Sequence, residues 1–139
     1  MRTVLDPNIL IAALLSPGGA PAQLTSRWLG GEFELVGSGA LLSELERALD
    51  YPKLRRRIPA DDVAEFVSLL RLAAVLTPDP EAGAYRSADP DDDYLLALAE
   101  HERTTLVAGD PHLLDLADDL PIQTARSFLD QLAGTSAPR

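Results

Sequence analysis

The stretch Arg2-Thr-Val-Leu-Asp-Pro-Asn-Ile-Leu10 decides the predicted fold, because it changes from a strand pattern to a helix pattern within a few residues. Its first part is β-branched and apolar. The pair Asp6-Pro7 separates it from a second apolar run that continues to Leu15. This pattern indicates a buried strand that leads directly into a helix. In an open parallel sheet such a junction lies at the carboxyl end of the strand, where α/β proteins place their sites. Asp6 is therefore the first candidate site residue.

Strand patterns alternate with helical patterns along the rest of the chain. The alternation predicts an α/β fold, a three-layer α/β/α sandwich with a central, mainly parallel sheet of four to five strands. Strands are expected at residues 2–5, 33–36, 75–76, 104–108 and 121–124. Helices are expected at residues 8–15, 22–29, 41–49, 53–57, 61–74, 91–102, 112–116 and 125–132, with a surface loop at 77–88.

The length of 139 residues suits one domain, expected at residues 1–133, followed by a disordered tail at 134–139. No apolar run is long enough to cross a bilayer, and the N-terminus lacks the pattern of a signal peptide. The chain has no cysteine, which excludes disulfides and thiolate metal sites. A cytoplasmic protein without a membrane partner is expected.

The formal net charge of -10 argues against a protein that holds nucleic acid on a broad basic face. It still permits a nuclease whose acidic site is neutralised by metal ions. One basic run stands out, and it is either a solvated helix end or a contact for RNA phosphates. Its members are Lys53, Arg55, Arg56 and Arg57.

Three Asp-Pro pairs, at Asp6, Asp89 and Asp110, each precede a predicted helix. Helix capping alone explains such pairs, since Asp is a preferred N-cap and Pro is favoured at the first helical position. The acidic residues 91–93 have an equally simple explanation in the helix dipole. Taken one at a time, these aspartates do not indicate chemistry.

Taken together, the aspartates do indicate a chemical site. Asp6 and Asp110 each end an apolar strand, and the helix that starts near Asp89 begins at the same edge of a parallel sheet. Several carboxylates in one crevice repel one another, and a divalent cation with oxygen ligands, Mg²⁺ or Mn²⁺, relieves this. Glu44 and Glu46 flank the apolar face of their helix at similar angles, so periodicity does not choose between them.

At these positions the chain resembles PIN-domain ribonucleases of the VapC-like group, which are the toxins of toxin–antitoxin pairs. The resemblance covers about residues 2–130 and implies a PIN-like fold. It rests on segments that occur in the family's order: Val4-Leu-Asp-Pro-Asn-Ile-Leu-Ile11, Leu41-Leu-Ser-Glu-Leu45, Asp89-Pro-Asp-Asp-Asp-Tyr-Leu-Leu-Ala97 and Val107-Ala-Gly-Asp-Pro-His-Leu-Leu114.

The resemblance implies that four carboxylates are the catalytic metal ligands. These are Asp6, Glu44, Asp93 and Asp110. Asp93 is preferred to Asp92, which is the reserve, because the family spacing of Asp, three residues and Ala fits Asp93 and Ala97. Asn8 is expected to hydrogen-bond within the site and to hold Asp6 in place.

Two positions depart from the family pattern. Pro7 replaces the usual Thr or Ser, which removes a hydroxyl that could position a carboxylate or water. His112 stands where many members carry a further Asp. Its imidazole could still contact metal or phosphate, but it supplies no negative charge. Both changes bear on activity rather than on the fold.

The expected function is therefore Mg²⁺- or Mn²⁺-dependent hydrolysis of single-stranded RNA, and the resemblance implies 5′-phosphate and 3′-hydroxyl products. It also implies a homodimer and a cognate antitoxin protein. Leu24, Trp28 and Phe66 are candidates for the dimer contact, unless they are simply core. The alternative is a catalytically impaired PIN fold that binds RNA or protein. A phosphoryl-receiver domain is disfavoured, since no second Asp lies two residues after Asp6 and no Lys lies in the C-terminal third.

Overall fold

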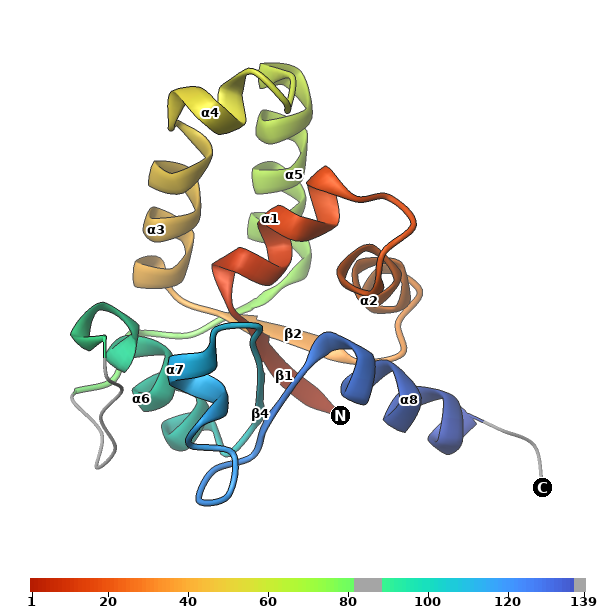
Figure 1. The fold of residues 1–139 in the computed structure, drawn as a ribbon, viewed down its shortest axis with the longest axis vertical. Coiled ribbons are helices and arrows are strands. Elements are labelled where there is room, and N and C mark those ends of the chain that lie inside the picture. Colours follow the sequence, from red (N-terminus) through yellow and green to blue (C-terminus); the bar gives the residue numbers. More distant parts are fainter. Residues whose placement is uncertain (82–88, 137–139) are drawn as a thin grey trace.

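The computed structural model describes residues 1–81 and 89–136 of the chain (Figure 1). Within these residues the strands are β1 (Arg2–Leu5), β2 (Glu34–Gly37), β3 (Val75–Leu76), β4 (Thr105–Val107) and β5 (Ile122–Gln123). The helices are α1 (Pro7–Leu15), α2 (Ala20–Leu29), α3 (Gly39–Leu49), α4 (Pro52–Arg55), α5 (Ala60–Ala73), the 3₁₀ turn η1 (Pro90–Asp92), α6 (Asp93–Glu102), α7 (Pro111–Leu114) and α8 (Ala125–Ser136).

The five described strands form one sheet in the order β3-β2-β1-β4-β5, and every pairing between neighbours is parallel. The predicted α/β class and sheet are confirmed. Right-handed crossovers place α1, α2, α3 and α5 on one face, and α6 and α7 on the other (Figure 1). In the middle of the sheet Val4 of β1 is paired with Val36 on one side and Leu106 on the other.

Strand order reverses beside β1. The chain first builds outward from β1 to β2 and β3, and then returns to add β4 and β5 on the opposite side. The carboxyl ends of β1 and β4 therefore open into the crevice where open α/β sheets bind ligands. Asp6 follows β1 directly and Asp110 comes three residues after β4, so the topology brings both to this crevice.

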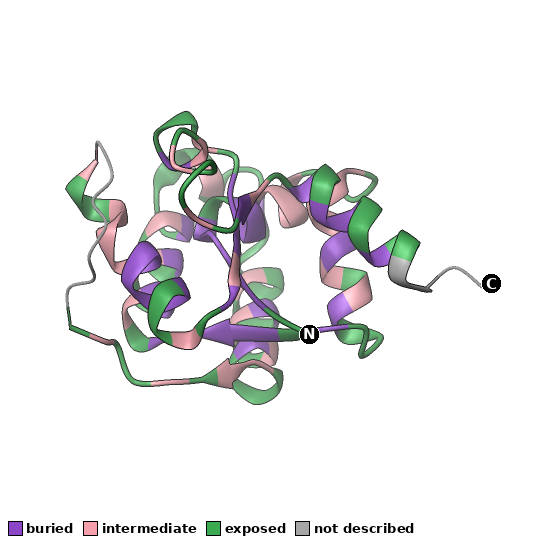
Figure 2. Ribbon diagram, turned by 90° about the horizontal axis from the view of Figure 1, so that it is seen from below, coloured by how far each residue is buried: buried purple, intermediate pink, exposed green. Residues whose placement is uncertain are grey.

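The hydrophobic core lies on both faces of the sheet, and Figure 2 shows the buried residues concentrated on the strands and the inward sides of the helices. Phe33 and Phe128 meet edge to face, with ring centroids 5.3 Å apart, and so join the β2 side of the sheet to α8. Leu24, Trp28 and Phe66 are all buried in this core. The core interpretation of these three residues is therefore correct, and they are not available for a dimer contact.

Several element ends differ from the sequence prediction. The helix expected at 91–102 is divided, because Pro90 opens a 3₁₀ turn before α6 begins at Asp93. The final strand is only two residues long; Pro121 has no N–H to donate, although its carbonyl accepts a 2.9 Å bond from the Leu106 N–H.

Helix α8 runs to Ser136, into the segment that was expected to be a disordered tail from residue 134. A glycine such as Gly134 costs a helix about 1 kcal/mol relative to Ala, which is too little to end it. Residues 137–139 and the 82–88 part of the expected loop lie outside the described residues. Among the described helices none is by itself long and apolar enough to cross a membrane. Helices α1 and α2 reach that length and composition only as a pair bent by 101°.

Candidate active site

Asp6 is the most deeply buried acidic residue of the candidate site. Asp6 directly follows the last residue of β1, and only 3% of it is exposed. The Asp6 N–H donates a 3.0 Å hydrogen bond to the carbonyl of Val107, which ties the end of β1 to the end of β4. Its Oδ1 accepts a 3.0 Å bond from the N–H of Asn8. The backbone of Asp6 is therefore fixed to β4, and its carboxylate is held by the N–H of Asn8.

The other two Asp-Pro pairs repeat this local geometry. Oδ1 of Asp110 accepts a 2.8 Å bond from the His112 N–H, and Oδ1 of Asp89 accepts a 3.0 Å bond from the Asp91 N–H. All three aspartates are thus N-caps, as the simpler interpretation held. Asp6 and Asp110 cap their helices and also lie at the crevice, because these two helices begin at the carboxyl ends of neighbouring strands.

The charges of two predicted site residues, Glu44 and Asp110, act on a third, Asp6. Burial raises the pKa of Asp6 to about 6; the hydrogen bond from Asn8 lowers it, while the negative charges of Glu44 and Asp110 raise it further. Asp6, Glu44 and Asp110 come from segments far apart in the sequence. The structure therefore brings these three predicted carboxylates into one electrostatic group. We call this group, together with Asp92, the acidic site.

Asp92 belongs to the same group. Burial raises its pKa to about 7, and its Oδ2 is buried without a hydrogen-bond partner in the described part of the chain. Four negative charges also raise this pKa: those of Asp6, Asp89, Asp110 and Glu44. Asp93, preferred from family spacing, starts α6 and is not among the charges that raise the pKa of Asp6 or Asp92. Asp92 is therefore the aspartate of this segment whose pKa the charges of the acidic site raise, and the choice between Asp92 and Asp93 as a metal ligand stays a prediction.

The structure also separates Glu44 from Glu46, which helical periodicity left equivalent. Glu46 points to the α5 side of α3 and pairs with Arg71. Glu44 points to the other side, where its Oε2 accepts a hydrogen bond from the hydroxyl of Tyr94 on α6. Helix α3 is held in this orientation at its start by Ser38 and by Asp79, whose Oδ2 accepts a 2.9 Å bond from the Ala40 N–H.

Tyr94 was not predicted as a site residue. Burial raises its pKa, and the hydrogen bond to Glu44 raises it further. The phenol therefore stays protonated and remains a donor. The sequence offers one signal for it, since Tyr94 directly follows the acidic run at the start of a helix. That signal does not show which acidic side chain the hydroxyl would meet.

The supporting residues occupy different positions from those expected. Asn8 is exposed, and it is the backbone N–H of this residue that holds Asp6, so the side-chain role predicted for Asn8 is not what fixes the carboxylate. Pro7 is the first residue of α1 and offers no hydroxyl to the site. His112 is exposed, and its ring Nδ1 lies 3.6 Å from Oδ1 of Asp110.

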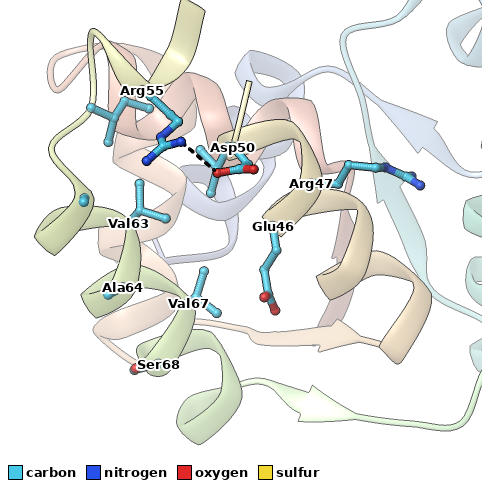
Figure 3. Close-up of a pocket in the computed structure, with 11 residues that line it drawn as sticks. Glu46, Arg47, Asp50, Arg55, Val63, Ala64, Val67 and Ser68 are labelled. Carbon is cyan, nitrogen blue, oxygen red and sulfur yellow. Dashed lines mark ion pairs between the residues drawn. The ribbon is translucent and has the colours of Figure 1, made fainter. Parts of the chain in front are cut away.

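The basic segment lies apart from the acidic site. Lys53, Arg55, Arg56 and Arg57 are exposed, and α4 sits at the end of α3 that is remote from the sheet (Figure 1). Arg55 is paired with Asp50 at 3.6 Å on the rim of a cavity of about 780 Å³ between α3 and α5 (Figure 3). These four residues could contact only a part of an RNA strand that extends outside the acidic site.

The donor chemistry of the acidic site fits a divalent cation. It gathers hard carboxylate oxygens, one of them the buried and unpartnered Oδ2 of Asp92, and their mutual repulsion is what a bound cation removes. In the described residues, no three His, Cys, Asp or Glu side chains are grouped closely enough to hold one ion as they stand. Binding would therefore require the carboxylates to draw together.

Comparison with known proteins gives a family match and a distant relative. Residues 2–112 match the family described as PIN domain, and this match includes every residue of the acidic site. The chain is also 21% identical over 143 aligned residues to the protein named Uncharacterized protein MJ1680 of Methanocaldococcus jannaschii, with 94% of this chain and 91% of that protein covered. The relative's name states no activity, so the family match is what bears on function.

Proposed function

The chain belongs to the PIN domain family, and from this premise we propose that it is a divalent-metal-dependent endoribonuclease that hydrolyses single-stranded RNA. PIN domains are generally nucleases and usually depend on divalent metal ions, so the nuclease-type fold is given by the family. The choice of RNA and of Mg²⁺ or Mn²⁺ is our proposal. It is supported by the acidic site at the carboxyl ends of β1 and β4.

We assign the metal to four carboxylates: Asp6, Glu44, Asp92 and Asp110. Asp93 remains the alternative to Asp92 that the family spacing favours. A divalent cation at such a site supplies hydroxide from water near neutral pH and offsets the negative charge that grows on the phosphate in the transition state. The raised pKa values of Asp6 and Asp92 support this assignment, because a cation stabilises the ionised form that burial disfavours.

The protein's own groups would position the reaction. The backbone holds Asp6 between Asn8 and Val107, and Tyr94 holds Glu44 through its hydroxyl. The exposed ring of His112, whose Nδ1 lies 3.6 Å from Oδ1 of Asp110, would contact the phosphate. Water adds to phosphorus and the bond to the 3′-oxygen breaks. The 3′-oxygen leaves with a proton, and the products are a 5′-phosphate and a 3′-hydroxyl.

The observation that carries this proposal is that Glu44 and Asp110, from distant parts of the sequence, both raise the pKa of Asp6 and of Asp92. The test is cleavage of a labelled single-stranded RNA with Mg²⁺ or Mn²⁺, followed by addition of EDTA. Asp6→Asn should lose activity, because it removes a charge and keeps the helix cap. Asp61→Asn, an exposed change in the first turn of α5, is the matched control. Equal activity of wild type and Asp6→Asn would defeat the assignment.

The proposal extends to the biological setting. We propose that the protein is the VapC-like toxin of a toxin–antitoxin pair, acting in the cytoplasm as a homodimer and blocked by a cognate antitoxin protein. The support is the order of the acidic motifs along the sequence. Growth arrest on expression, with relief by Asp6→Asn, tests the toxin role, and sedimentation measures the oligomeric state. RNA binding without any cleavage would instead indicate the impaired binding module.

A further inference from the structure

The side of α3 that carries Glu44 also carries Arg47, and it extends away from the acidic site. An open groove of about 730 Å³ runs along it between α3 and the start of α6. Six of its lining residues bear on the argument, and they are Asn8, Glu44, Arg47, Tyr51, Asp91 and Tyr94. Glu44 and Tyr94 belong to the region of the acidic site, so the groove is continuous with that site. We call the surface that carries Arg47 and Tyr51 the α3 groove face.

Arg47 and Tyr51 line this groove in register with Glu44. Glu44 and Arg47 are spaced i and i+3 in α3, which places them on one side of the helix, and Tyr51 follows the end of α3 and lines the same groove. Helix α3 ends at Leu49, and the Tyr51 N–H donates a 3.2 Å bond to the carbonyl of Ala48, which closes a turn directly after the helix and holds Tyr51 beside the same groove. At a rise of 1.5 Å per residue, Arg47 lies about 5 Å beyond Glu44 along the axis of α3, and Tyr51 lies farther along the groove.

Arg47 is the one cationic side chain that lines the groove in the described part of the chain. It is exposed and makes no ion pair there, whereas its neighbours Arg55 and Arg71 are paired with Asp50 and Glu46. Figure 3 shows its side chain leaving α3 away from Asp50 and from α5. In a protein of charge -10, this places an unpaired cation beside the acidic site, where a phosphate would pass.

Tyr51 contributes little to the fold through its ring. It is 59% exposed, and it is the N-cap of α4 without a side-chain capping bond. An exposed aromatic ring in a groove offers a flat surface on which an unpaired base can stack, and such stacking is available only to single strands. Beyond Tyr51 the chain enters the basic segment at Lys53. The cations of that segment would extend the same path.

We propose that the α3 groove face binds the single-stranded RNA next to the cleavage site, with Arg47 on a backbone phosphate and Tyr51 stacked on an unpaired base. This assignment rests on the proposed nuclease function, since it takes the acidic site as the place of cleavage. It names a path for the strand, from Glu44 along α3 toward the basic segment. It also explains how an acidic protein could hold a polyanion.

The test measures binding apart from cleavage. A labelled oligouridylate is titrated by fluorescence anisotropy into the full-length Asp6→Asn protein, which should bind without cutting, at several salt concentrations. Tyr51→Ala should weaken the Kd about tenfold, and Tyr51→Phe should keep it, because the ring is retained. Arg47→Ala should weaken binding and lower the slope of log Kd against log salt by about 0.7. Arg126→Ala, an exposed change on α8, is the control and should alter neither quantity.

The outcomes separate this inference from the nuclease proposal. If wild type cleaves RNA but Arg47→Ala and Tyr51→Ala behave like Arg126→Ala in both Kd and kcat/KM, the groove assignment is overturned and the nuclease stands. If no metal supports cleavage but binding depends on both residues, the nuclease proposal fails, and only the part of the assignment that makes the groove a binding site for single-stranded RNA is supported. A duplex RNA should bind with no dependence on Tyr51; an equal dependence would overturn the stacking role. Thermal unfolding checks that each variant is folded.

Discussion

The hydroxyl of Tyr94 donates a hydrogen bond to Oε2 of Glu44, and this contact joins α6 to α3 at the edge of the acidic site. It fixes one of the four proposed metal ligands from outside the ligand set. Groups that orient a ligand in this way commonly matter almost as much to activity as the ligands themselves. The contact also explains why Glu44 rather than Glu46 faces the crevice.

Replacing Tyr94 by Phe should lower metal-dependent RNA cleavage about 10- to 100-fold. The ring stays, so packing is kept, while Glu44 loses the donor that orients it. The measurement is kcat/KM at saturating Mn²⁺, together with a Mn²⁺ titration to find whether the loss lies in metal affinity. Glu44→Gln should be at least as impaired. Full activity of Tyr94→Phe would show that Glu44 needs no such support.

The two neighbouring aspartates should respond differently. Asp92→Asn should reduce cleavage about 100-fold or more, whereas Asp93→Asn should keep activity within about threefold of wild type, because the charges of the acidic site act on Asp92. Single-turnover cleavage of the same RNA measures both variants side by side. The opposite ranking would restore the ligand assignment drawn from the family spacing.

Added Mn²⁺ should stabilise the folded protein, because the ion binds the native carboxylates and not the unfolded chain. At 100 times its Kd a ligand contributes about 2.7 kcal/mol, which corresponds to a rise of several degrees in Tm. Thermal unfolding with and without Mn²⁺ tests this for wild type and Asp110→Asn, and the variant should show a much smaller rise. Asp61→Asn should respond like wild type. Equal shifts in all three proteins would indicate only weak surface binding.

Without metal, stability should fall as the pH rises from about 4 to about 7. The pKa of Asp6 rises from 3.8 to about 6 on folding, so the folded state binds more protons than the unfolded state in this window. The free energy of unfolding therefore decreases until the group is ionised in both states. Asp6→Asn removes this loss and should be the more stable protein at pH 8, by on the order of 3 kcal/mol. Urea unfolding in EDTA at pH 5 and pH 8 measures the difference. A variant that is less stable than wild type at pH 8 would contradict the raised pKa.

Local sequence patterns were enough to predict the helices and strands whose positions depend on residues close together in the sequence. Alternation of strand and helix patterns predicted a parallel sheet with helices on both faces, and capping rules predicted where α1, η1 and α7 begin. The position of Asp6 followed from the same rules, since it caps a helix at the end of a central strand. Helix α8 ran past its predicted end because a glycine alone is a weak stop signal.

The sequence by itself thus determined the layers of the fold and delivered Asp6 and Asp110 to one edge of the sheet. Only the tertiary structure decided which side chains meet there. Adjacent helical residues differ by about 100° in direction and Glu44 and Glu46 are symmetric about an apolar face, so local patterns leave each choice open. The charge of Asp6 raises the pKa of Asp92 at the end of η1, and Glu46 pairs with Arg71 on α5, away from the crevice. Contacts between segments distant in the chain make these choices, and no periodicity within one segment encodes them.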